Sequence, residues 1–466
     1  MALDKEERSV IDPDNVLLTD IEELIHSGSA AMLKNILADL YDFDIAVLID
    51  NLHEDDDAVY LFSLLSDETS SQIILELSDR RRSYILSKIG REKLSNIVSE
   101  MDSDDAADLV AELDFDIQRE VLADLDKIDK EDSDEVRELM KYDESTAGGI
   151  MAKEFISVNQ HLTVREAVKV VQNKADEMDQ FYNVWVVDDD MKLVGIISLK
   201  RLIIALKEPE QKMYEVMNTE AISVRDDVDQ EEIAKIFKSY DLVSMPVVDS
   251  QNRVIGKITI DDIIDVIEEE HTENVAIMTG TDAQELEKKS PFEIAKLRLP
   301  WILITLGIEL IAVFVIKTHS QILEKIILLA AFMPIISAIS GNTGLQSAAI
   351  VVRALDTGYV NIKRWWSPVI RQLKTTLIIG SVIGFNIGVV GYLMSDDNQF
   401  TFGIVVAISM FTSINIAGLV GTIVPIISKS LGFDPALTSG PFETAFQDVV
   451  GISIFLTIAS VLLINI

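Results

Sequence analysis

The sequence predicts a multidomain protein: an all-α superhelical domain, an α/β tandem repeat, a connecting helix and a five-span α-helical membrane domain. The first observation is charge, because 78 acidic and 40 basic residues give a formal net charge of −38 although the mean hydropathy is positive. Residues 1–298 hold the whole excess, with 70 acids and 32 bases, whereas residues 299–466 hold eight of each. The other two observations are a repeated segment between residues 148 and 270 and five apolar stretches after residue 298. An acidic soluble half is therefore joined to a neutral membrane half.

The expected parts follow one another along the chain. They are an acidic helical domain at 1–140, two repeat units at 141–205 and 206–262, a connecting helix at 263–290 and a membrane domain at 291–466. The first residues, "MALDKEERSVIDPDN", contain no charged segment followed by an apolar one, so we expect no cleaved signal peptide.

Residues 15–140 carry a helical pattern throughout. Stretches such as "SQIILELSD" and "DAADLVAELDFD" recur and predict a superhelical bundle of short helices. Asp104 and Asp108 are one helical turn apart and face the same way. An acidic surface of this kind repels nucleic acid and anionic lipid and attracts cations.

The available side chains favour hard cations. The chain has no cysteine, and its five histidines form no close-spaced pair, whereas carboxylates abound. Oxygen ligands of this kind select Mg²⁺, Ca²⁺ or Mn²⁺. No G-x-x-x-x-G-K-[ST] loop is present, which argues against pumping driven by ATP through that motif. An intramembrane aspartyl protease is also disfavoured, because it needs two facing aspartates and Asp448 alone among the aspartates lies deep in an apolar stretch.

The repeat is visible as two copies offset by 61 residues. "VWVVDDDMKLVGIISLKRLI" (184–203) parallels "MPVVDSQNRVIGKITIDDII" (245–264), and a similar lead precedes each copy. Alternating apolar residues and the turn sequences "DDDMK" and "SQN" predict strand, helix, strand, turn, strand, helix in each unit. The repeat resembles a tandem cystathionine-β-synthase-type (CBS) pair, a regulatory module that commonly senses small ligands, and ATP is therefore a candidate cofactor.

The segment after the repeat, "DDIIDVIEEEHTENVAIMTGTDAQELEKK" (261–289), is expected to form one long helix that joins the repeat to the membrane domain. Asp262, Asp265 and Glu269 share a face of this helix. Like charges at this spacing destabilise a helix unless something neutralises them. The stripe is the basis for expecting regulation by a cation.

Five stretches approach the length and apolarity needed to cross a bilayer, at about 299–316, 326–352, 375–394, 400–427 and 436–464. Lysine and arginine gather before the first, between the second and third, and between the fourth and fifth. These loops and the large N-terminal half are therefore expected in the cytoplasm, with the chain a multi-pass protein of the cell (inner or plasma) membrane. Gly380, Gly384 and Gly388 lie four residues apart in the third stretch and predict close helix packing.

The second stretch is interrupted by polar and helix-breaking residues. Pro334 is followed by the run "SGNTGLQ" (340–346) in otherwise apolar sequence. Non-helical backbone at membrane depth persists only where protein packs around it or where it lines a watery path. We therefore expect a broken helix facing an ion pathway, with a polar contact between helices as the alternative.

The last stretch holds a carboxylate. Asp448 lies about twelve residues after the start near Ala436, or roughly 18 Å at helical rise, which places it near the bilayer centre. Thr444 is one turn earlier on the same face. An ionisable residue near mid-span is by default a candidate functional site. Glu443 lies nearer the cytoplasmic end, where hydration is expected.

Together these features resemble the MgtE family of magnesium channels over essentially the whole chain, most specifically in "GNTGLQSAAIVVRAL" (341–355) and "DPALTSGPFETAFQDVVG" (434–451). The resemblance implies a non-enzymatic homodimer in membrane lipid, with a plug helix before the five spans. It implies a pore site for a hydrated ion at Asp448 and Thr444, with Gly341 and Asn342 from the second span. It also implies regulatory Mg²⁺ sites at Asp104, Asp108, Asp229, Glu231, Asp241, Asp262, Asp265, Glu270 and Glu273.

Three positions depart from the family pattern. Ser340 stands where the family has glycine, and Gly418 stands where asparagine is usual, with Asn415 one turn earlier. Asn274 occupies a position where the family can carry aspartate.

The resemblance implies a Mg²⁺-selective channel that imports Mg²⁺ down its electrochemical gradient. Cytosolic Mg²⁺ is expected to close it by bridging the acidic faces of the helical domain, the repeat and the plug helix. Two alternatives stay open: transport of another divalent cation such as Co²⁺ or Mn²⁺, and coupling to H⁺ or Na⁺ through Asp448.

Overall fold

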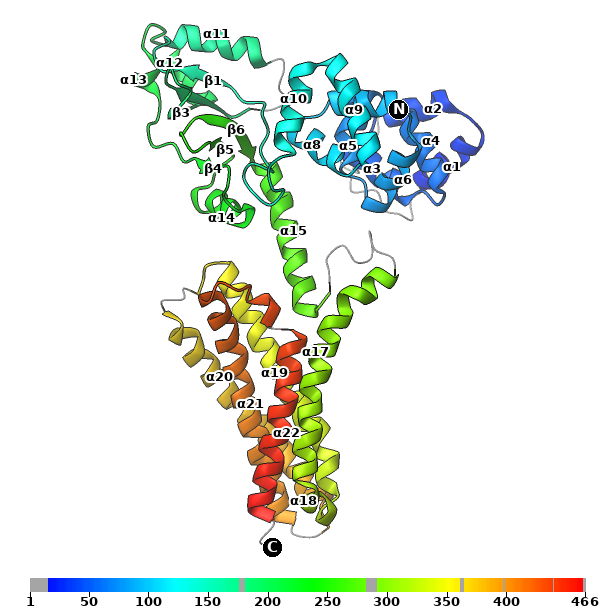
Figure 1. Cartoon of the computed structure of the whole chain (residues 1–466), viewed down its shortest axis with the longest axis vertical. Coiled ribbons are helices and arrows are strands. Elements are labelled where there is room, and N and C mark those ends of the chain that lie inside the picture. The colour runs from blue at the N-terminus through cyan, green and yellow to red at the C-terminus, as the bar shows by residue number, and fades with distance from the viewer. Residues whose placement is uncertain are drawn as a thin grey trace. The chain divides into compact units, whose positions relative to one another are not determined.

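The computed structural model describes residues 16–175, 181–281, 291–360, 364–396, 399–438 and 440–463. The chain divides into two compact units, Met1–Glu270 and His271–Ile466. Figure 1 shows the helices and strands of both units.

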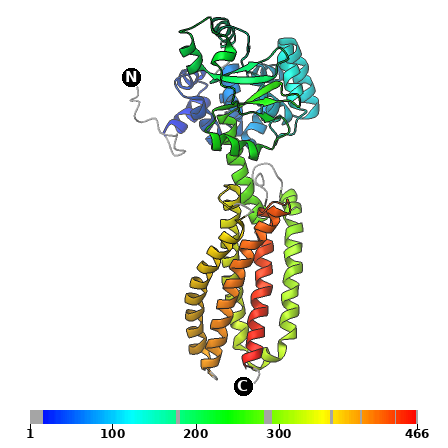
Figure 2. The same cartoon turned by 90° about the vertical axis from the view of Figure 1, so that its left-hand side faces the viewer.

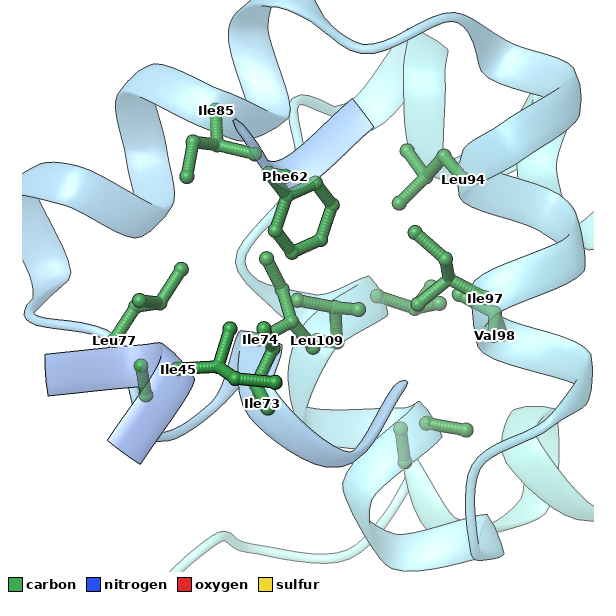
Figure 3. Close-up of a cluster of buried hydrophobic side chains, with 14 of the residues drawn as sticks. Ile45, Phe62, Ile73, Ile74, Leu77, Ile85, Leu94, Ile97, Val98 and Leu109 are labelled. Atoms are coloured by element: carbon green, nitrogen blue, oxygen red, sulfur yellow. The ribbon is translucent and has the colours of Figure 1, made fainter. Parts of the chain in front are cut away.

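Short helices form the first part of the first unit, as the sequence predicts. Their apolar faces meet in one core in which Phe62, Ile73, Ile97 and Leu109 are fully buried (Figure 3). Most of them carry an acidic residue in the first turn, where a negative charge is favoured by the helix dipole. Part of the acidic excess is therefore structural. The helices are α1 (Val16–His26), α2 (Ala30–Leu37), α3 (Asp42–Asn51), α4 (Asp55–Ser63), α5 (Asp67–Ile74), α6 (Asp79–Lys88), α7 (Arg91–Ser99), α8 (Ser103–Ala111), α9 (Phe115–Ile128) and α10 (Lys130–Leu139).

Two sheets of identical topology follow in the first unit and confirm the predicted repeat. In each sheet the first strand pairs parallel with the second, and the second pairs antiparallel with the third. The first copy comprises β1 (Ser157–Asn159), α11 (Val164–Lys174), β2 (Asn183–Val187), β3 (Leu193–Ser198) and α12 (Leu199–Ala205), with α13 (Met213–Val216) after it. The second comprises β4 (Val224–Arg225), α14 (Gln230–Tyr240), β5 (Ser244–Val248), β6 (Val254–Thr259) and α15 (Ile260–Thr279).

The two copies are related residue by residue. Met191 and Asn252 hold the same turn position and both adopt positive φ, 63° and 64°. Asn183 donates its side-chain amide to the hydroxyl of its counterpart Ser244 at 2.9 Å. Each lead segment also crosses to the opposite copy: Gly195 lies against Asn218, and Gly256 lies against Ala152. The copies therefore form one interlocked module.

The connecting helix is shorter than predicted. α15 ends at Thr279, where Gly280 adopts φ 73°. The amide of Gly280 bonds to the carbonyl of Ile277, and the amide of Thr281 bonds to that of Ala276. This pair of bonds is the Schellman motif, which ends a helix at a left-handed glycine. The prediction of one uninterrupted helix is wrong at Gly280, and residues 282–290 lie outside the described part of the chain.

The membrane unit contains the five predicted spans among its described residues. The long helices α17 (Pro291–Thr318), α19 (Leu328–Asp356), α20 (Trp366–Met394), α21 (Gln399–Ser430) and α22 (Pro441–Leu463) are each long and apolar enough to cross a membrane, and they run side by side (Figure 2). The short α18 (Ser320–Lys325) joins the first two, and a 3₁₀ turn, η3 (Ala436–Thr438), precedes α22. Gly380, Gly384 and Gly388 are buried and face α21, which confirms the packing role of this stripe.

The expected break in the second span is absent. α19 is continuous over 29 residues, and its polar side chains bond back to its own carbonyls. The hydroxyls of Ser340, Thr343 and Ser347 donate to the carbonyls four residues earlier at 2.7–2.8 Å. Neighbouring helices bury these three residues, and Gln372 of α20 donates to the Ser347 hydroxyl. The prediction of a break is therefore wrong, and the run makes a polar contact with α20 at Ser347.

Candidate functional site

Asp448 occupies the eighth position of α22 and faces α19. The hydroxyl of Ser337 donates a hydrogen bond to the Asp448 carboxylate. A Cβ placed on Gly341 would lie 3.6 Å from the Thr444 methyl and 3.8 Å from an Asp448 carboxylate oxygen. The structure therefore brings together three of the four predicted pore residues. α22 begins at Pro441 rather than near Ala436, so Asp448 lies about 10 Å along this helix rather than roughly 18 Å.

A second acid, Glu309, joins Asp448. Glu309 lies within α17, and its carboxyl is within hydrogen-bonding reach of the Asp448 carboxylate. The sequence interpretation missed Glu309, although an acid near the middle of an apolar stretch is itself a signal of function. Two carboxyls in contact favour the binding of a cation between them, because they cannot both ionise cheaply without one.

Part of this site lies on the surface of the single chain. Asn342 and Thr444 are exposed and Asp448 is half-buried. Polar side chains of a spanning helix are costly when they face lipid, and they ordinarily line a cavity or a protein contact. We therefore expect this face to line a cavity or to be covered by another protein surface.

Acidic side chains also cluster in the first unit. Carboxylate oxygens of Asp102, Asp104 and Glu154 all lie within 4.8 Å of one another. The Ser103 amide and hydroxyl hold the Glu154 carboxylate at 3.0 and 2.9 Å, and Lys257 approaches Asp102 at 4.0 Å. Glu154 was not predicted, because it comes from the lead of the repeat, 50 residues after Asp104. Such a set of oxygen donors fits Mg²⁺ or Ca²⁺.

The pKa values around the cluster are raised. Desolvation raises the pKa of Asp108 to about 7, with nearby acids such as Glu144 and Glu269 adding to it. Desolvation also raises the pKa of Asp262 to about 6. Burial, with the negative field of Asp262 and its neighbours, raises the pKa of Asp104 well above its usual range. Crowded carboxylates of this kind bind cations because a positive charge relieves their repulsion.

The stripe on α15 faces acids of the helical domain. Asp262 lies near Asp104. Asp265 lies near Glu76, and burial together with the negative charge of Asp265 raises the pKa of Glu76. Thr259 donates both its amide and its hydroxyl to Asp262, at 2.8 and 2.9 Å. The interaction of like charges across two elements is thus built into the first unit.

The remaining predicted regulatory residues are not gathered into one site. Asp229 caps the start of α14, Glu231 pairs with Lys235 at 2.8 Å, and Asp241 ends the same helix with φ 51°. An 11-residue helix separates its ends by about 16 Å, too far for a shared ion within one chain. Glu270 accepts a hydrogen bond from Gln230 at 3.0 Å, and Glu273 is exposed.

The end of α15 packs against the start of α22 within the membrane unit. A Cβ on Gly440 would collide with the Met278 carbonyl. Gly440 is one residue before Pro441, where α22 starts. The connecting helix is therefore in direct contact with the helix that carries Asp448.

The departure at Gly418 has a structural explanation. A Cβ on Gly418 would collide with the Thr376 methyl, and the Thr376 hydroxyl donates to Asn415 at 3.1 Å. Asn415, one turn before Gly418, thus links α21 to α20 through its hydrogen bond with Thr376. Glycine at position 418 leaves the space that the Thr376 side chain occupies. At the other departure, Ser340 is fully buried.

The fold and the site define a class: a multi-pass membrane transporter for cations with a soluble acidic module that contains a CBS pair. Three family models match the chain: the MgtE divalent cation transporter at 333–458, the MgtE intracellular N domain at 40–145, and the CBS domain at 147–208 and 213–269. The chain is 34% identical over 330 residues to the magnesium transporter MgtE of Enterococcus faecalis, covering 71% of this chain and 72% of that one. It is 32% identical over 340 residues to the magnesium transporter MgtE of Thermus thermophilus, covering 72% of this chain and 74% of that one.

Two solved structures are similar to part of this chain. The soluble part of a magnesium transporter is 30% identical, with a TM-score of 0.48, and covers 54% of this chain and 97% of its own. The cytosolic domain of the Mg²⁺ channel MgtE in complex with ATP is 30% identical, with a TM-score of 0.49. The match covers 53% of this chain and 99% of that one.

The chain belongs to the MgtE family of magnesium transporters, which are not enzymes. It is a membrane protein whose N-terminal domains are cytosolic. These assignments confirm the predicted family, fold class and location.

Proposed function

We propose that the protein is a Mg²⁺ channel that imports the ion down its electrochemical gradient and that cytosolic Mg²⁺ closes. The observation that carries the proposal is the group formed by Asp448, Glu309 and Ser337 beside the exposed Thr444 and Asn342. Mg²⁺ dehydrates reluctantly and uses few carboxylates. A site with few carboxylates on an open face suits a hydrated ion.

A homodimer completes the pathway in this proposal. A second copy packed on the face that carries Asn342 and Thr444 would remove their polar groups from lipid and place two Asp448 carboxylates across a twofold axis. An inward-negative potential then contributes about 2.3 kcal/mol per charge per 100 mV to entry.

Closure is proposed to come from the acidic stripe of α15. Without Mg²⁺, the acids near Asp104, Asp108 and Asp262 repel one another. Bound Mg²⁺ relieves that repulsion and fixes α15, whose last turn touches Gly440 at the start of α22. Ligand shifts the two states only through its different affinity for them, and several weak sites supply that difference together.

The first experiment is uptake into liposomes by the wild type and Asp448→Ala, with Mg²⁺, Mn²⁺, Co²⁺ and Ca²⁺ compared at equal gradients. Uptake that favours Mg²⁺ and is lost in the variant supports the proposal. Transport that persists in the variant would make Asp448 a structural acid. Uptake that favours Co²⁺ or Mn²⁺, or that needs a proton or sodium gradient, would support the alternative transport classes.

ATP remains a prediction for the CBS pair. Equilibrium binding of labelled ATP to the full-length protein tests it, and absence of saturable binding would contradict it.

A further inference from the structure

A carboxylate separate from Asp448 is enclosed in the membrane unit. Glu443 lies in the first turn of α22 and is 2% exposed, and Gln447, one turn later, is 0% exposed. The hydration expected for Glu443 from its place in the sequence is therefore wrong. Its carboxylate oxygens and both polar atoms of the Gln447 amide have no hydrogen-bond partner among the described residues. The Gln447 amide is within reach of the Glu443 carboxylate, although the two form no hydrogen bond in this structure.

The neighbouring helices are shaped around this carboxylate. A Cβ on Gly344 of α19 would collide with the Glu443 carboxylate, and a Cβ on Gly421 of α21 would collide with the Gly344 carbonyl. Further along α22, a Cβ on Gly451 would lie 3.5 Å from the hydroxyl of Ser413, which is also buried without a partner among the described residues. Close packing of α19 and α21 thus surrounds this part of α22, and no ion pair to Glu443 occurs among the described residues.

We propose that Glu443 and Gln447 form a binding site for a monovalent cation inside the membrane unit. An ionised carboxylate in a low-dielectric interior is costly unless it is paired. One monovalent cation balances one carboxylate, whereas a divalent ion would leave a net positive charge in the same enclosure. Carboxylate and amide oxygens are ligands for hard cations.

Enclosure also argues against Mg²⁺ at this position. Mg²⁺ usually keeps several of its waters, and residues that are 0–2% exposed leave little space for a hydrated ion. The site at Asp448 differs because Asp448 is half-buried and already accepts a hydrogen bond from Ser337. The two sites therefore suit different ions, and this proposal does not depend on Mg²⁺ conduction.

The test is the thermal stability of the full-length protein in detergent, in NaCl and in N-methyl-D-glucamine chloride at equal ionic strength and fixed pH. A bound cation stabilises the folded state in proportion to its occupancy, so Na⁺ should raise Tm by a few degrees in a saturable manner. Glu443→Gln should abolish the increase because it removes the charge with little change in shape. Gly344→Ala should weaken it by displacing the carboxylate.

Two controls keep the interpretation specific. Gly307→Ala should retain the full increase because no atom lies within 4 Å of its added Cβ. Asp448→Asn should also retain it, which separates this site from the pore site. Equal Tm of the wild type in the two salts, or a Na⁺ effect that survives in Glu443→Gln, would overturn the proposal. A Tm that depends on pH in the wild type but not in Glu443→Gln, and that does not depend on Na⁺, would likewise overturn the proposal. It would indicate a protonated Glu443 carboxyl.

Discussion

In the proposed function, Asp448 and Glu309 are the carboxyls that hold an ion in the membrane unit. They come from helices at opposite ends of the membrane domain sequence, yet their carboxyls are within hydrogen-bonding reach. Ser337 donates to Asp448 and fixes its orientation. Loss of either carboxyl should therefore weaken the site.

We expect Glu309→Gln to raise the half-saturating Mg²⁺ concentration for uptake about tenfold, which corresponds to ~1.4 kcal/mol. The reason is the loss of one of two negative charges at the ion. Liposome uptake over a range of Mg²⁺ concentrations measures it. Glu324→Gln, an exposed acid of α18, is the matched control. Equal concentration dependence in Glu309→Gln and the control would show that Glu309 does not bind the ion.

Arg82 is a buried arginine that satisfies several acceptors of the helical domain. It is 8% exposed, forms two hydrogen bonds to Glu112 at 2.9 and 2.7 Å, and donates to the Leu75 carbonyl at 2.9 Å. Arg82→Met should destabilise the domain by about 3 kcal/mol because it leaves buried acceptors without a donor. Amide hydrogen exchange in α5–α8 should accelerate about 100-fold.

Arg80 supplies the comparison, because its side chain is 75% exposed and pairs with Asp55 at 3.1 Å. Arg80→Met should change exchange little, since exposed pairs contribute about 0–1 kcal/mol. If both variants exchanged alike, burial would not be the cause.

Among the elements, spans, strands and repeats were predictable, and boundaries and breaks were not. The offset of 61 residues predicted even the paired turn residues Met191 and Asn252, because turn chemistry is local. The break in α19 was predicted wrongly because the polar run keeps helical backbone, with hydroxyls such as that of Ser340 bonded within their own helix. Glu154 was missed because its partners are distant in the sequence, whereas Glu309 was missed although its place in an apolar stretch was a signal of function. No local pattern encodes such contacts.

The contact between α15 and α22 carries an element-scale prediction. Gly440→Ala should displace the last turn of α15, because the added Cβ would collide with the Met278 carbonyl. We expect uptake at low cytosolic Mg²⁺ to stay near the wild-type rate and the inhibiting Mg²⁺ concentration to rise about fivefold, ~1 kcal/mol. Uptake into liposomes preloaded with graded Mg²⁺ measures this, with Gly307→Ala as control. Unaltered inhibition would mean that closure does not pass through this contact.

Over the whole molecule, the net charge of −38 opposes compact folding, and in the proposed function it also attracts cations. The excess lies in the cytosolic half, where the acids around Asp104 and Asp262 raise one another's pKa values. Repulsion between folded elements opposes compactness, and a divalent cation that binds between them reverses the sign of that effect. In the proposed function, this acidic composition is a means of sensing cations.

Removal of Mg²⁺ should therefore loosen the cytosolic half as a unit. We expect limited proteolysis of the full-length protein to be about tenfold faster in EDTA than in Mg²⁺ near α15, because the acids near Asp262 then repel one another without a counter-ion. In Asp262→Asn/Asp265→Asn, the two rates should become nearly equal, and inhibition of uptake by Mg²⁺ should weaken in parallel. Glu210→Gln, in which the replaced side chain is 78% exposed, should keep the wild-type difference between the two proteolysis rates.

A double variant that is still cleaved more slowly in Mg²⁺ would place the responsive acids elsewhere, on α8 and Glu154 rather than on α15. Proteolysis that responds to Mg²⁺ while uptake does not would separate cation binding in the cytosol from control of the membrane unit.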